Sequence, residues 1–160
     1  MEYRTSPEPD DVNLILGLHS DGYRDLDWRF ESDCLDAFLA HVQATLAEVN
    51  LNDRQSNRVW FAEENGKALG CAGLLQRGTK GQLRWVVLLP MARGRGIGKQ
   101  LVQQAFDFAR DMGLEEMYLE TTNGLEASMS LYESMGFVVE STSTEQMWFG
   151  KGCQPLLFSI

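Results

Sequence analysis

The chain has 160 residues, 44% of them hydrophobic and 23% charged, and a formal net charge of −9. This length and composition predict one globular domain over residues 1–160. An acidic chain lacks the basic patch that nucleic acid requires, and no apolar run is long enough to span a membrane, so we expect neither partner. The cysteines Cys34, Cys71 and Cys153 form no CxxC pair, and the N-terminus lacks a secretory pattern. We therefore expect no metal site, no disulfide framework and a cytoplasmic protein.

The first third of the chain predicts a short strand and two helices. In order, these are a strand over Tyr3–Ser6, a helix from Asp10 or Asp11 to about Ser20, a loop over 21–31, and a helix from Ser32 or Asp33 through about Val49. His19 and Tyr23 lie four residues apart, so they share a face if the first helix continues past Gly22.

The middle of the chain predicts an antiparallel meander. Strands are expected over Arg58–Glu63, Ala68–Gln76 and Leu83–Leu89, with tight turns at Asn65-Gly66 and Gly78–Gly81. A helix over Gly96–Met112 follows, because apolar residues recur there at helical spacing before Gly113.

The last third alternates between strands and one short helix. The predicted elements are a strand over Met117–Thr121, a helix over Glu126–Met135, and strands over Phe137–Ser141, Gln146–Phe149 and Leu156–Ile160. The whole order predicts an α+β fold around one mixed sheet. The helix after Leu83–Leu89 is a crossover, so that strand should pair parallel to Met117–Thr121.

A glycine-rich turn lies between the central strand and the following helix. Gly94, Gly96 and Gly98 alternate there, and the free N–H groups of a helix start attract phosphate. The turn fits neither GxGxxG, because Lys99 stands where a third glycine is needed, nor the P-loop pattern GxxxxGK[ST], because Gln100 follows Lys99. The turn therefore predicts a ligand that carries phosphate, but not one of the ligands that these two motifs bind.

The run VVLLPMARGRGIG, followed by Leu131-Tyr132-Glu133-Ser134-Met135-Gly136-Phe137, resembles the GNAT superfamily of acyl-CoA N-acyltransferases. That family carries Q/R-x-x-G-x-G/A, here Arg93, Gly96 and Gly98, and often LYxxxGF. The resemblance implies a sheet of about seven strands flanked by about four helices. The spacing of His19, Tyr23, Trp28, Phe30 and Glu31 is similar to acetyltransferase domains fused to MarR-type regulators.

The resemblance also implies how acetyl-CoA would be held, as a co-substrate and without a metal. The backbones of Val86 and Leu88 would pair with the pantetheine arm, and the Leu88 N–H would stabilise the oxyanion. The pyrophosphate would lie on the turn, formed by Arg93, Gly94, Arg95, Gly96, Ile97, Gly98 and Lys99. Asn123 resembles a further cofactor-binding residue of the family, at a longer spacing to Tyr132 than usual.

Two residues are expected to move protons. Tyr132 matches the family's general acid, which protonates the leaving thiolate. The general base is open: the central strand offers only Arg84, so Glu120 is the nearest carboxylate, and the amine could also arrive neutral or lose its proton to water. For the acceptor, Tyr23 and Trp28 could stack on an amine and Glu31 could attract it.

The expected function is therefore transfer of an acetyl group from acetyl-CoA to a primary amine of a small molecule or peptide, by direct attack in a ternary complex. Two alternatives stay open: transfer of a longer acyl group, and a catalytically silent acyl-CoA-binding module. The family resemblance also makes a homodimer an expectation.

Overall fold

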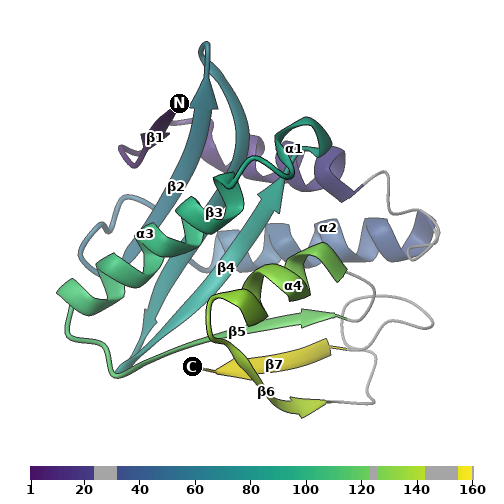
Figure 1. Cartoon of the computed structure of the whole chain (residues 1–160). Helices are drawn as coiled ribbons and strands as arrows, with labels where there is room; N and C mark the ends of the chain where they lie inside the picture. The colour runs from purple at the N-terminus through teal and green to yellow at the C-terminus, as the bar shows by residue number, and fades with distance from the viewer. Residues whose placement is uncertain (24–31, 123–125, 143–154, 160) are drawn as a thin grey trace.

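The computed structural model describes residues 1–23, 32–122, 126–142 and 155–159. Within these residues one mixed sheet runs through the molecule, with helices on both faces (Figure 1). The strands are β1 (Glu2–Arg4), β2 (Asn57–Glu64), β3 (Lys67–Arg77), β4 (Lys80–Leu88), β5 (Glu116–Thr122), β6 (Val138–Thr142) and β7 (Pro155–Ser159). The helices are α1 (Asp11–Tyr23), α2 (Ser32–Ala47), α3 (Ile97–Asp111) and α4 (Glu126–Ser134), with a one-turn 3-10 helix, η2, over Pro90–Ala92.

The strands of the sheet lie in the order β1-β2-β3-β4-β5-β7-β6. Strands β1 to β4 pair antiparallel, as the predicted meander requires, and Asn65 and Gly66 both have the positive φ that a tight hairpin turn needs. β7 lies between β5 and β6. The predicted strand over Gln146–Phe149 lies outside the described residues.

The central parallel pair was predicted correctly, but it is short. β4 pairs with β5 only through Lys80–Gln82 opposite Glu116–Tyr118. Beyond that point the two strands diverge, as Figure 1 shows. Among the strands of the described residues, the rest of β4, up to Leu88, therefore has a neighbour only on its β3 side.

Two pairs of helices cover the opposite faces of the sheet. Consecutive side chains of a strand point to opposite faces, so Val87 and Leu88 identify the two sides. A Cβ built at Gly22 of α1 would meet Val87, whereas one built at Gly98 of α3 would meet Leu88 and Leu131 of α4. Helices α1 and α2 therefore lie on the Val87 face, and α3 and α4 on the Leu88 face.

The core lies between these helices and the sheet. Its largest fully buried side chains are Ile15, Phe61, Cys71, Leu74, Leu75, Leu101 and Val102. The face of α3 that was predicted from helical spacing is buried at Ile97, Leu101 and Ala105. No helix of the described residues is long and apolar enough to cross a bilayer.

The first helix is longer than expected. We predicted a loop from residue 21, yet α1 continues through Gly22 to Tyr23. The reason is tertiary contact: Gly22 lies directly against the end of β4, and Tyr23 is buried there. His19 and Tyr23 therefore share a face, with their ring centroids 5.8 Å apart.

Candidate active site

A β-bulge interrupts β4 opposite Cys71 and Gly73. The pairing shifts from Gly73–Arg84 to Cys71–Val87, so β4 carries one residue more than β3 across this step. Trp85 lies in the bulge with φ 51°, a left-handed conformation that is uncommon for a bulky residue. Bulges bend a strand and increase its twist, which accounts for the divergence of β4 from β5.

Side chains from three elements hold the bulge in place. The Tyr23 hydroxyl donates to the Val86 carbonyl at 2.9 Å, and the Cys71 thiol donates to the Trp85 carbonyl at 3.1 Å. The Trp85 indole N–H donates to Thr45 Oγ1 at 3.1 Å. The strained strand is thus fixed from α1, α2 and β3, as expected for a conformation that the surroundings must impose. Sequence reasoning missed the bulge, because it depends on these long-range contacts.

The end of β4 presents a free backbone edge. The Leu89 N–H donates to the Leu69 carbonyl at 2.8 Å, which makes that pair a hydrogen-bonded one. Hydrogen-bonded and non-hydrogen-bonded pairs alternate along an antiparallel ladder, so the backbone groups of Leu88 point away from β3. They point to the side where β5 has already diverged. This is the position expected of an oxyanion donor.

The turn after β4 exposes backbone donors at the start of α3. Gly94 and Gly96 have φ values of 73° and 76°, and a Cβ at either would meet nothing within 4 Å. Gly96 is the N-cap and offers no side chain, and the first intrahelical bond is that of Gln100 to the Gly96 carbonyl. The N–H groups of the first helical turn are therefore available to an anion. Gly98 differs: it lets α3 approach Leu88 and Leu131 closely.

The three basic side chains near the turn, Arg93, Arg95 and Lys99, have different surroundings. The Arg93 guanidinium donates to the Gly22 carbonyl and, at 3.5 Å, to the Leu88 carbonyl, so it ties α1 to the end of β4. Arg95 forms an exposed ion pair with Glu64 at 2.5 Å. Lys99 lines a groove.

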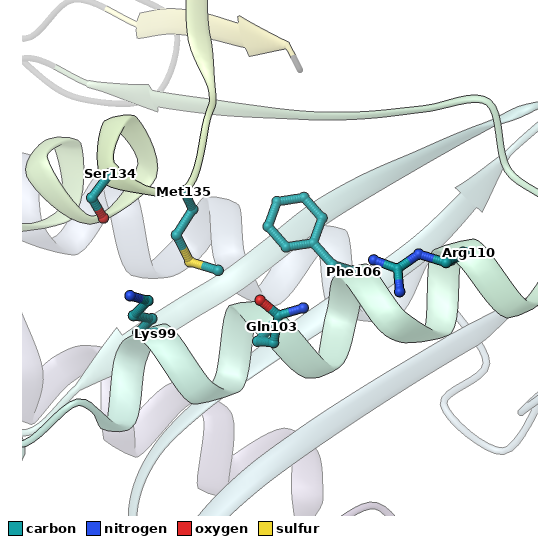
Figure 2. A pocket seen from close by; sticks show the side chains of 6 residues that line it. All are labelled: Lys99, Gln103, Phe106, Arg110, Ser134 and Met135. Atoms are coloured by element: carbon teal, nitrogen blue, oxygen red, sulfur yellow. The ribbon is translucent and has the colours of Figure 1, made fainter.

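That groove lies between α3 and α4 and has a volume of about 350 Å³. Figure 2 shows Met135 reaching toward α3 over the groove. The lining residues are Lys99, Gln103, Phe106, Arg110, Ser134 and Met135. Four of them recur on α3 at helical spacing, a pattern that could have identified Arg110 and Gln103 from the sequence. Two cations here give the groove a positive character in an otherwise acidic protein.

Tyr132 and Tyr23 approach the diverging strands from opposite faces of the sheet. Tyr132 is buried on α4, with its ring 5.9 Å from that of Phe137. Burial raises the pKa of Tyr132 and, next in size, so does the nearby Tyr23. Burial likewise raises the pKa of Tyr23, and Arg93 opposes that shift. The two hydroxyls therefore lie within electrostatic reach of each other beside the free edge of β4.

The structure locates two of the remaining predicted site residues, Tyr23 and Glu120. Glu120 is exposed on β5, opposite Leu157 of β7. Trp28, Glu31 and Asn123 lie outside the described residues. Tyr23, expected to stack on an acceptor, is instead buried against Phe38, with ring centroids 5.2 Å apart. A carboxylate close enough to act on an amine is thus not identified among the described residues.

Comparison with known proteins agrees with this geometry. The model of the acetyltransferase (GNAT) family matches residues 21–137. The chain belongs to the GNAT family. The uncharacterized N-acetyltransferase YjgM of Escherichia coli K12 is 33% identical over an alignment of 103 residues, which covers 58% of this chain and 62% of that protein. The chain spans less than two thirds of the length of the curated relatives that it matches first.

Solved structures show the same GNAT fold over the full chain. The PaiA N-acetyltransferase of Thermoplasma acidophilum, solved with coenzyme A, has a TM-score of 0.79 at 16% identity, covering 99% of this chain and 98% of that one. The spermidine N-acetyltransferase of Vibrio cholerae, solved with coenzyme A and spermine, has a TM-score of 0.66 at 18% identity, covering 99% and 94%. The predicted GNAT fold is therefore confirmed.

Proposed function

We propose that this GNAT protein is an acetyl-CoA-dependent N-acetyltransferase that acts on a primary amine by direct attack in a ternary complex. The observation that carries the proposal is the free edge of β4 at Leu88, beside a buried tyrosine and a glycine turn with open backbone donors. A silent acyl-CoA-binding module would need the turn but would not need Tyr132 at that edge.

The residues present fit acetyl-CoA. The first-turn N–H groups of α3 and the open space at Gly94 and Gly96 suit the pyrophosphate. The cationic groove at Lys99 and Arg110 suits the phosphorylated nucleotide. The backbone edge at Val86 and Leu88 suits an extended arm that adds like a strand, although the Val86 carbonyl already accepts one bond from Tyr23 and the Leu88 carbonyl one at 3.5 Å from Arg93. Acetyl-CoA supplies an acyl thioester, which an amine can attack.

Three steps are assigned to this chain. As the amine nitrogen bonds to the acyl carbon, the Leu88 N–H donates to the developing oxyanion, a contribution of about 3 kcal/mol in comparable sites. As the carbon–sulfur bond breaks, Tyr132 gives its proton to the sulfur, because burial keeps its phenol protonated. The amine's proton leaves to water or to Glu120, which stays the predicted base.

Other predictions are kept as part of the proposal. Asn123 as a cofactor contact, and Trp28 and Glu31 as acceptor contacts, fall on residues that the structure does not describe. A homodimer and the finer likeness to MarR-fused domains also stay predictions. Spermidine, the acceptor named for the Vibrio cholerae neighbour, is one candidate of the primary-amine class.

A paired measurement tests the proposal. Calorimetry measures binding of acetyl-CoA, and a thiol assay measures free coenzyme A released with each amine of a panel. We expect binding together with amine-dependent release. Binding with no release for any amine would favour the silent module, and release from a longer acyl-CoA in preference to acetyl-CoA would favour the alternative transferase.

A further inference from the structure

Arg84 lies where β4 and β5 begin to diverge. The last parallel pair is Gln82 with Tyr118, so Arg84 is level with Glu120 across the opening. The Arg84 guanidinium extends toward α2, where it donates to Nε2 of His41 at 3.5 Å and lies 5.8 Å from the Trp85 ring. It is thus on the α1–α2 side, opposite the groove between α3 and α4.

This guanidinium forms no ion pair with a carboxylate of the described residues. Within residues 1–23, 32–122, 126–142 and 155–159, no carboxylate oxygen lies within 4 Å of it, and Glu120 and Glu48 act on it only at longer range. Burial lowers its pKa, yet an arginine stays charged at neutral pH. Its partner His41 accepts through Nε2, and burial together with Arg84 lowers the pKa of His41.

Arg4 shows what an arginine paired with carboxylates looks like in the same chain. Its guanidinium donates to both carboxylate oxygens of Asp11, at 2.7 and 3.2 Å, and it also pairs with Glu63. Arg84 has five donors and one long hydrogen bond to a neutral ring. A partly desolvated guanidinium in this state is a receptor for a planar anion.

We propose that Arg84 binds a carboxylate on the amine acceptor, so that the preferred acceptors are amines that also carry a carboxylate. This inference rests on the proposed function. A carboxylate matches one planar guanidinium, whereas the charges of Glu120 and Glu48 would repel a phosphate dianion more strongly than a carboxylate, and Arg77 adds positive charge at longer range. A polyamine would be repelled by Arg84 and Arg77.

The strand sets the distance between the two ends of such an acceptor. Arg84 and Leu88 are four residues apart, at most roughly 13 Å along the strand, because the bulge at Trp85 lies between them. The arginine side chain spans part of that distance toward the acceptor. The carboxylate and the reacting amine are therefore expected to be separated by several bonds, as in a dipeptide or an ω-amino acid.

Matched acceptor pairs test the inference in the thiol-release assay. The pairs are glycylglycine with glycylglycinamide and 4-aminobutyrate with 4-aminobutyramide, and spermidine is the polycation. We expect kcat/KM to be about 10-fold or more higher for each carboxylate than for its amide. Arg84→Gln should remove that preference and leave the Kd for acetyl-CoA unchanged, with Arg84→Met as a second variant that keeps the apolar stem near Trp85.

The control is Lys67→Gln, which removes an exposed cation from β3 that is not among the charges acting on Arg84, and it should keep the preference. If the amides or spermidine are used as well as the carboxylates, and the Arg84 variants do not alter the ranking, the inference is overturned while acetyl transfer stands. If wild-type protein releases no thiol with any amine, the proposed function fails, and this inference fails with it.

Discussion

At the scale of single residues, burial determines the chemistry of Tyr132. Its phenol has a raised pKa because water is excluded and Tyr23 is close by. The same exclusion of water would raise the basicity of a thiolate expelled beside it. The pKa of the Tyr132 phenol and that of the thiol would therefore remain similar, although the buried phenol is a weaker acid than tyrosine in water.

Tyr132→Phe should lower kcat by about 100-fold or more and leave the Kd for acetyl-CoA nearly unchanged, because it deletes only the proton donor. The ring contact with Phe137 is retained, so the fold should not change. Thiol release and calorimetry give the two quantities. Tyr3→Phe, on β1, is the matched control with full activity expected. A kcat equal to that of wild type would remove Tyr132 from the mechanism.

The burial of His19 makes the free energy of unfolding depend on pH. It is 2% exposed, its Nδ1–H donates to the Ile15 carbonyl at 2.8 Å, and burial lowers its pKa to about 4. In the unfolded chain the pKa returns to about 6.5. The unfolded state therefore binds a proton more readily, and the stabilisation present above pH 6.5 is lost as pH falls toward 4.

Between pH 7.5 and 4.5 this histidine should remove about 2.5 kcal/mol from the free energy of unfolding. His19→Phe keeps a ring against Tyr23 and Phe38 and cannot titrate. Urea unfolding at both pH values should show a loss for wild type that exceeds the loss for the variant by about that amount. Equal losses would show that His19 is not buried in its neutral form.

At the scale of elements, the contact between α1 and β4 is central. Gly22 allows the helix to reach the strand end, and Arg93 bonds to both the Gly22 and Leu88 carbonyls. Tyr23 then bonds to the bulge. Helix α1 and the end of β4 are thus held together as one rigid unit.

Gly22→Ala tests this unit. A Cβ there would lie 2.4 Å from a Val87 methyl group and 3.1 Å from the Leu88 carbonyl oxygen, so helix and strand must move apart. We expect a loss of about 1–3 kcal/mol in urea unfolding and a lower kcat. Gly17→Ala is the control on the same helix, because its Cβ meets nothing within 4 Å, and it should stabilise by about 0.4–1 kcal/mol. Equal stability of the two variants would contradict the close contact.

Some of these elements could be predicted from neighbouring residues in the sequence, and others could not. The hairpin at Asn65-Gly66, the apolar face of α3 and the glycine turn all follow from nearby residues, and the structure has them. The bulge at Trp85, the inward direction of Arg93 and the extension of α1 depend on partners that include residues 40 to 71 positions away. Sequence patterns with a period of two or 3.6 residues carry no information on such contacts.

At the scale of the whole molecule, the two faces of the sheet have different roles. The α3–α4 face carries the glycine turn and a cationic groove, whereas the α1–α2 face carries Arg84 and the side chains that hold the bulge. The faces meet only where β4 and β5 diverge. A reaction that joins two separately bound molecules is suited to this arrangement.

The central claim is that the Leu88 N–H binds the thioester carbonyl, and one NMR measurement tests it directly. Val87-Leu88 is the only Val-Leu pair in the sequence, so labelling valine with carbonyl ¹³C and leucine with ¹⁵N isolates this single amide. A new hydrogen bond moves the amide proton downfield. We expect a downfield shift of the Leu88 amide proton with saturating acetyl-CoA and a smaller one with coenzyme A, which lacks the acetyl carbonyl. An unchanged Leu88 amide at saturation would contradict the account.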